Sequence, residues 1–257
     1  MIATLVNMDP SPRRDEPPPR GLLLLSAAWI ALSVLVAFGT RPPLLPLAAT
    51  YSPAVRLSLI VLLGGILIAY PLLRLTQPVT SRPMRRAILD LAVLLGAIHA
   101  YLWPVRLATQ WSLERTAAID LLLCGAALAA VGLVLLGTRR EHGRTAWMLL
   151  VLALTAGPIV AGPLLAAIAG ASWRGDGSLG HGSPGDGWLD VGSIAPALPF
   201  VALERLASST TVPLGADEWR LALVPTIAGV VLLAIAMAIA AGTRRTPPGT
   251  RASMGHG

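Results

Sequence analysis

The sequence contains little charge. Only 13% of its 257 residues are Asp, Glu, Lys or Arg, whereas soluble domains usually carry about 25%. Hydrophobic residues make up 54% of the chain, and the mean hydropathy is +0.69. This shortage of charge indicates that lipid is the main solvent, and it leaves little sequence for a soluble domain.

Lysine is absent, and all 20 basic side chains are arginines. Together with abundant Ala, Gly, Leu and Pro, this usage is typical of a GC-rich bacterial gene, so we expect a protein of the bacterial cytoplasmic (inner) membrane. The net charge of +7 does not predict a nucleic-acid partner. The arginines lie at the ends of apolar runs, where membrane topology accounts for them.

Cysteine is nearly absent too. Cys124 is the only one, which excludes an internal disulfide, a CxxC redox motif and a zinc site built on several cysteines. It lies inside an apolar run, where a cysteine usually acts as a small hydrophobic side chain.

Long apolar runs are what the sequence has in abundance. Six of them approach the length of about 20 residues that a helix needs to cross a hydrocarbon core of ~30 Å. The first is Gly21–Thr40, and arginines bound the other five at 56–74, 86–106, 115–139, 144–174 and 220–244. Arg41-Pro42-Pro43 follows the first run where a signal peptide would have small residues, so we expect an uncleaved helix.

These runs predict an all-α integral membrane protein of six transmembrane helices. Its membrane domain covers 21–243 and includes an outer loop at 171–219. The polar segments 1–20 and 244–257 are expected to be disordered and cytoplasmic.

The arginines predict the orientation. With the N-terminus inside, the inner segments hold 13 arginines and the outer segments hold 7. An arginine excess in short loops is typical of the cytoplasmic side. Both ends of the chain are therefore predicted to be cytoplasmic. An interfacial aromatic belt at the outer ends agrees; it consists of Trp103, Trp111, Trp173, Trp188 and Trp219.

The outer loop contains one further helix by its pattern. A Gly-rich tether at 175–187 precedes Ile194–Ser208, which is apolar again. Phe200, Leu203 and Leu206 share a broad helical face, with charged residues nearer its edge. This pattern predicts a short amphipathic helix at the outer interface, between the fifth and sixth spans.

Ionisable side chains inside spans are costly, so each is a functional candidate. At 1.5 Å per residue, His99 and Asp120 lie about 10 Å and about 8 Å below the outer arginines of consecutive antiparallel spans. Arg106 shares a helical face with His99. These three residues form a candidate intramembrane polar cluster. Two interpretations stay open: a structural pair that locks the helices together, or a proton or substrate site.

The other polar residues predict no cofactor and no metal. Asp90 lies near the start of the third run, where we expect a structural ion pair with inner-surface arginines. A bis-histidine haem is not expected, because no second histidine matches the depth of His99. Asp176, His181 and Asp186 lie in the tether, which has too much glycine to hold a metal ion rigidly.

The fifth run contains two Gly-Pro steps, Gly157-Pro158 and Gly162-Pro163. Proline removes a helical hydrogen bond, so these steps predict a bent or broken span. Exposed backbone at membrane depth is tolerated only against protein or a water-filled cavity. The candidate helix break therefore indicates a pathway or hinge, or else a passive kink that fits the helix to its neighbours.

This organisation resembles the permease subunit of type-2 ABC transporters, the exporter class. The resemblance is carried by topology and by the last third of the chain, where the apolar segment 194–203 precedes an Ala-rich span that ends in Arg244-Arg245. It implies six spans, both termini inside, short outer helices before the last span, and a separate ATPase as partner.

Two functions follow as expectations. The first is a permease-like transporter subunit that acts as a dimer with a cytoplasmic ATP-binding protein. The alternative is a non-catalytic accessory or anchoring subunit of a larger, respiratory-type membrane complex, which the scarcity of polar residues in the spans favours. An enzyme is not expected, because paired carboxylates, a metal cluster and a nucleophile motif are not recognised in the sequence.

The orientation can be tested by cysteine labelling in a Cys124→Ser background. A cysteine at Ser178, in the outer loop, should react with a membrane-impermeant thiol reagent in intact cells. A cysteine at Gly143, in an inner loop, should not react, because the bilayer excludes the reagent. Labelling at Gly143 without labelling at Ser178 would reverse the orientation.

Overall fold

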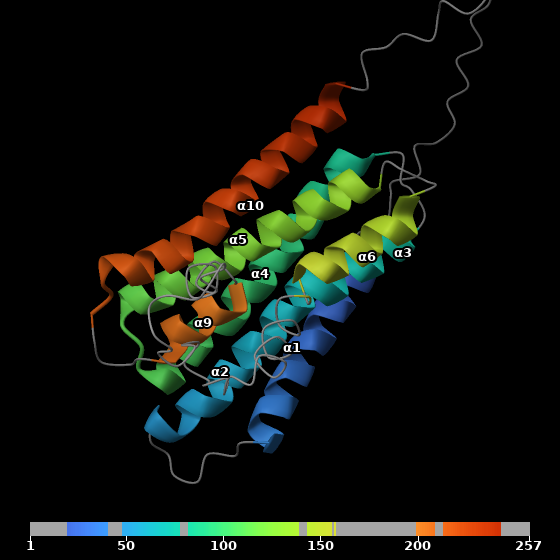
Figure 1. Ribbon diagram of the computed structural model, residues 1–257. Helices are drawn as coiled ribbons and strands as arrows, with labels where there is room; N and C mark the ends of the chain where they lie inside the picture. The colour runs from blue at the N-terminus through green and yellow to red at the C-terminus, as the bar shows by residue number, and fades with distance from the viewer. Residues whose placement is uncertain are drawn as a thin grey trace, which may run out of the picture.

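A computed structural model of the chain describes residues 20–40, 48–77, 82–138, 143–155, 157, 199–208 and 213–242. These residues contain helices and no strand, as predicted (Figure 1). Five helices are long and apolar enough to cross a membrane, as expected for a multi-pass membrane protein. They are α1 (Arg20–Thr40), Thr50–Thr76, α4 (Pro83–Thr109), α5 (Leu113–Gly137) and α10 (Ala216–Gly242).

The predicted fifth run is described only in part. It contributes α6 (Arg144–Thr155) and Gly157, and a helix of 12 residues is about 18 Å long at 1.5 Å per residue. α5 ends and α10 begins at opposite ends of the bundle (Figure 1). A sixth crossing between them stays a prediction.

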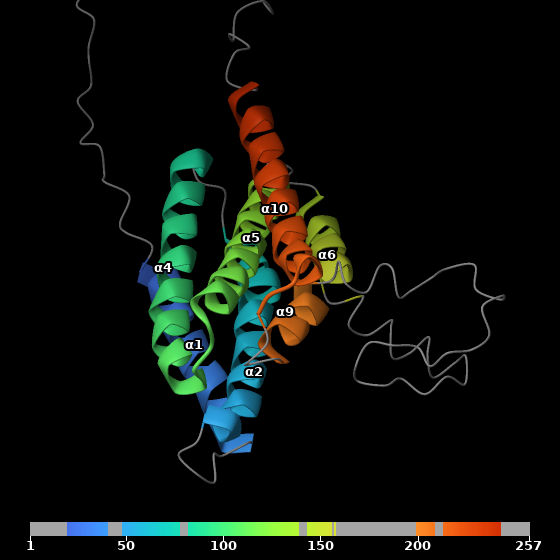
Figure 2. The same cartoon turned by 90° about the vertical axis from the view of Figure 1, so that its left-hand side faces the viewer.

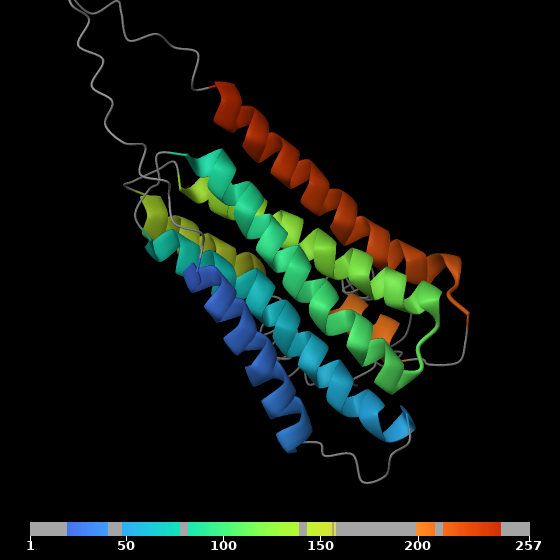
Figure 3. The ribbon, with the colours of Figure 1, turned by 180° about the vertical axis from the view of Figure 1, so that it is seen from behind.

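The long helices lie side by side in one bundle. α5 lies between α4 on one side and α10 with α6 on the other (Figure 2). Its Ile119, Leu122 and Leu123 are fully buried. The beginning of α1 and the end of α10 lie at the same end of the bundle (Figures 1 and 3). That arrangement agrees with two chain ends on one side, and the side of the membrane that they face stays a prediction.

Glycines allow α5 and α10 to pack closely. A Cβ atom on Gly125 would lie 2.5 Å from Cα of Thr226, and one on Gly229 would collide with the carbonyl oxygen of Gly125. The Thr226 hydroxyl donates to the carbonyl of Leu121 at 2.7 Å. Small residues permit such backbone approach in membranes.

The second span contains a local π turn. It consists of α2 (Ala48–Gly64), the π-helical turn η1 (Gly65–Ala69) and α3 (Tyr70–Thr76). Pro71 has no N–H to continue the α-helical ladder, and the wider turn comes directly before it. Trp29 of α1 packs where a Cβ of Gly65 would lie, and its Nε1 donates to the carbonyl of Val61 at 2.8 Å.

The predicted amphipathic helix is present as α9 (Pro199–Ser208), and residues 194–198 lie outside the described residues. Leu203 and Leu206 are buried, whereas Glu204 and Arg205 are exposed. The apolar face packs against α2, α5 and α10. α9 therefore covers the end of the bundle where α5 and α10 begin (Figure 1).

Candidate functional site

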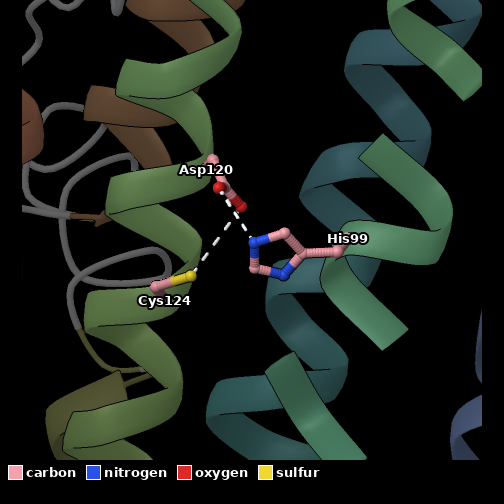
Figure 4. Close-up of side chains that lie close together, drawn as sticks. All are labelled: His99, Asp120 and Cys124. Atoms are coloured by element: carbon pink, nitrogen blue, oxygen red, sulfur yellow. Dashed lines mark hydrogen bonds and ion pairs between the residues drawn. The ribbon is translucent and has the colours of Figure 1, made fainter. Parts of the chain in front are cut away.

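His99 and Asp120 meet across α4 and α5, as expected from their depth. The His99 Nε2 atom lies 3.2 Å from Oδ2 of Asp120, and the two side chains are 47% and 20% exposed. Figure 4 shows the imidazole directed from α4 toward the carboxylate on α5. The pair is therefore formed within the chain, but it lies at the surface of the bundle.

A tight connection sets this register. α4 ends at Thr109 and α5 begins at Leu113. Gln110 between them is left-handed, with φ 56°, and the Ser112 side chain accepts from the backbone N–H of Arg115 at 3.2 Å. His99 lies about 15 Å from the end of α4, and Asp120 about 10 Å from the start of α5, at 1.5 Å per residue. Both residues are therefore at membrane depth.

The contact made by Nδ1 of His99 shows which ring nitrogen carries the hydrogen of the neutral imidazole. Nδ1 is 2.7 Å from the carbonyl oxygen of Leu95, one turn earlier on α4. A carbonyl oxygen only accepts, so Nδ1 donates its hydrogen there. Nε2 and the Asp120 carboxylate then face each other as two acceptors unless a proton or a cation lies between them.

Cys124 completes a triad on the same side of α5 (Figure 4). Its thiol donates to Oδ1 of Asp120 at 3.7 Å. The ligand atoms of His99, Asp120 and Cys124 all lie within 4.8 Å of one another. From the sequence, Cys124 is predicted to act only as a small hydrophobic side chain. The i, i+4 spacing from Asp120 was the available signal, because residues four apart share a helical face.

Arg106 lies outside this triad. Its guanidinium lies 5.8 Å from the ring centroid of Trp103, and its Nε donates to the carbonyl of Trp111 at 3.4 Å. Arg106 and Asp120 form no ion pair in the described part of the chain. The stacking energy of a cation on an aromatic face holds the guanidinium at the helix end instead.

The candidate helix break is largely outside the described residues. Gly157 is helical, while Pro158, Gly162 and Pro163 are among the residues that the structure does not describe. The broken fifth span stays a prediction.

Asp90 forms the expected ion pair with an arginine, but the partner is not on its own helix. It pairs with Arg74 of α3, and both side chains are buried, at 3% and 5% exposed. The Tyr70 hydroxyl donates to Asp90 at 3.1 Å. Arg85 and Arg86 are the arginines nearest to Asp90 in sequence. The guanidinium that contacts the Asp90 carboxylate is nevertheless that of Arg74.

Gln77 extends this inner polar cluster to further helices. Its side-chain oxygen accepts from Arg74 and from Arg86, each at 2.6 Å. Its backbone carbonyl accepts from Arg144 of α6 at 3.0 Å. The cluster therefore joins α3, α4 and α6 at the end of the bundle that is predicted to be cytoplasmic.

A second arginine cluster holds α9 in place. Arg115 is fully buried; it donates to the carbonyl of Leu206 at 2.7 Å and lies 3.7 Å from the Glu218 carboxylate. Arg56 donates to the carbonyl of Ser208 at 2.8 Å. Both arginines belong to segments that are predicted to be outer, and the side of the membrane stays a prediction. They satisfy carbonyls in the last turn of α9, which lack partners within their own helix.

Comparison of the chain with protein-family models, curated proteins and solved structures gives no match.

A double-mutant cycle tests the contact between His99 and Asp120. His99→Leu or Asp120→Leu alone leaves one polar side chain without its partner, so the double replacement should lower the melting temperature less than the sum of the singles. Residues in contact show coupling of about 0.5–3 kcal/mol. Thermal unfolding in detergent measures it, with Glu204→Leu on the exposed face of α9 as a control for charge removal. Additive losses would show that the pair contributes nothing.

Proposed function

We propose that this chain is a membrane-embedded subunit of a larger assembly, permease-like and acting with a separate ATPase. The observation that carries the proposal is the exposure of the His99–Asp120 pair. Hydrocarbon offers no hydrogen bonds, so polar groups at membrane depth face the bundle interior, a water-filled cavity or protein. The side chain of His99 is 47% exposed, and contact with another protein subunit would shield this face from hydrocarbon.

The position of α9 supports the permease-like assignment. An outer helix directly before the last span is a feature of the exporter permeases that the sequence resembles. Arg115 and Arg56 fasten α9 through the carbonyls of Leu206 and Ser208. A helix held by two charge-assisted contacts acts as a fixed cover over the outer end of the bundle rather than as a loosely attached loop.

The inner polar cluster supports a cytoplasmic partner. Arg74, Arg86 and Arg144 all bind Gln77, so three helices are joined at one end. Because these helices are joined, a conformational change in a docked ATPase would move them together. The net positive charge of this end favours an acidic docking face on that partner.

The accessory role remains the second candidate, and the cavities of the described residues favour it. One cavity of about 30 Å³ lies among α1, η1 and α4, and one of about 40 Å³ lies at the inner polar cluster. Each is about the size of one water molecule. A hollow of about 480 Å³ among α5, α6 and α10 is lined mainly by apolar side chains. These cavities offer no continuous polar route, as an anchoring subunit would require none.

Copurification decides between the two roles. The full chain, extracted in mild detergent without added cross-linker, should bring down an ATP-binding protein that mass spectrometry identifies. Copurification of haem or iron–sulfur subunits without an ATPase would instead establish the accessory role. Isolation of a monomer alone would contradict both.

Cysteine cross-linking tests the proposed interface in a Cys124→Ser background. Gly96 lies one turn before His99 on α4 and is exposed, and a side chain there meets no other atom within 4 Å. Gly96→Cys should cross-link to a second copy or to another membrane subunit. Gly39→Cys on α1, which is equally open, is the matched control and should cross-link less. Equal yields at both positions would mean that α4 is no interface.

A further inference from the structure

We propose that His99, Asp120 and Cys124 bind a divalent transition-metal ion of the zinc type. The three side chains supply one nitrogen, one oxygen and one sulfur, which are the donors that Zn²⁺ uses in proteins. Their ligand atoms lie within 4.8 Å of one another. This inference goes beyond the proposed function and does not depend on it, because one chain supplies all three donors.

The three donors must move closer together to hold a metal ion, because their ligand atoms lie within 4.8 Å of one another and His99 and Cys124 contact different oxygens of the Asp120 carboxylate. Metal–ligand bonds of ~2.0–2.3 Å place the donors of a tetrahedral site ~3.3–3.8 Å apart. Nε2 of His99 is 3.2 Å from Oδ2 of Asp120, and Sγ of Cys124 is 3.7 Å from Oδ1. Asp120 and Cys124 lie one helical turn apart on α5, so their backbone spacing is set by the helix itself.

His99 is held in the tautomer that binds metals. Its Nδ1 donates to the Leu95 carbonyl at 2.7 Å, which leaves the lone pair of Nε2 directed at Asp120. Histidine ligands in proteins donate their other ring N–H in the same way to a carbonyl or carboxylate. A cation between Nε2 and the carboxylate removes the conflict between two facing acceptors.

Charge balance favours a metal ion over a proton alone. When Zn²⁺ binds, the Cys124 thiol loses its proton to solvent, and the ion with a carboxylate, a thiolate and a neutral imidazole forms a set with no net charge. A neutral set is the one that low dielectric surroundings penalise least. A proton shared by His99 and Asp120 also neutralises that pair, and the Cys124 thiol then donates a hydrogen bond to Asp120 without being a ligand.

The three donors also predict an open coordination position on the metal ion. Three protein ligands leave a fourth position for water or another molecule, which is the arrangement of exchangeable zinc sites. The 47% exposed side chain of His99 places that position on the surface of the bundle. The site is therefore accessible without unfolding of the helices.

Cobalt substitution tests the site, because Co²⁺ accepts the same ligands as Zn²⁺ and reports them by absorption. The intact chain, purified without a histidine tag, is titrated with Co²⁺ in detergent. We expect one Co²⁺ per chain and a thiolate-to-cobalt charge-transfer band. Cys124 is the only cysteine in the chain, so that band has one possible source. Zn²⁺ should displace Co²⁺ and raise the melting temperature.

Single variants assign the other two ligands. Cys124→Ser should abolish the band. His99→Ala and Asp120→Asn should each weaken Co²⁺ binding more than about 10-fold, since even loss of an outer-shell partner costs 10–100-fold. His142→Ala is the matched histidine control and should leave binding unchanged. Far-ultraviolet circular dichroism shows that each variant keeps its helices.

Three results would overturn the proposal. These are a spectrum without the charge-transfer band, a Zn²⁺ effect on melting that survives Cys124→Ser, and binding that is insensitive to both His99→Ala and Asp120→Asn. Any of them would leave His99 and Asp120 as a proton-sharing pair. Because the titration uses the chain alone, its outcome is independent of whether an ATPase copurifies.

Discussion

The buried ion pair between Arg74 and Asp90 holds together the end of the bundle where α3 ends and α4 begins, because hydrocarbon offers neither charge another partner. Both side chains are nearly inaccessible, so each charge depends on the other and on the groups around them. Tyr70 binds Asp90, and Gln77 binds Arg74, Arg86 and Arg144. Gln77 thereby connects α6 and the start of α4 to that pair. At the opposite end, the buried Arg115 donates to a carbonyl of α9 and pairs with the carboxylate of Glu218.

These contacts divide the polar groups of the membrane domain into two kinds. Arg74 and Arg115, one at each end, are buried and bind partners from other helices, so they stabilise the bundle. The triad of His99, Asp120 and Cys124 is at membrane depth and partly exposed. Its polar groups are not needed to close the core, because α5 already buries Ile119, Leu122 and Leu123. A polar group that is costly in lipid and unnecessary for packing is the strongest functional candidate. The protein partner and the metal ion are two separate ways to satisfy it.

The sequence predicted the elements well and their lateral contacts only in part. Five of the six expected spans and α9 were predictable because apolar length and helical period are local properties. The His99–Asp120 contact was predictable because sequential antiparallel helices are neighbours and depth can be counted from their ends. The contact of Arg115 with α9 was not predicted because its partner, Leu206, is 91 residues away, and no local pattern reports where α9 packs. The same holds for Gly125 and Gly229, since their contact depends on the rotation of two helices that are distant in the chain. Cys124 was missed because an isolated cysteine has the same pattern as a small apolar residue.

The central claim is that ionisable side chains inside this bundle are stabilised by one another across helices. Its most direct test is a double-mutant cycle on Arg74 and Asp90, with the free energy of unfolding measured in lipid–detergent micelles. Arg74→Leu and Asp90→Leu should each cost about 3–5 kcal/mol, because each leaves a buried charge without its partner. The double variant should recover most of that loss, since two leucines are compatible with an apolar interior. Losses that simply add in the double variant would contradict the account.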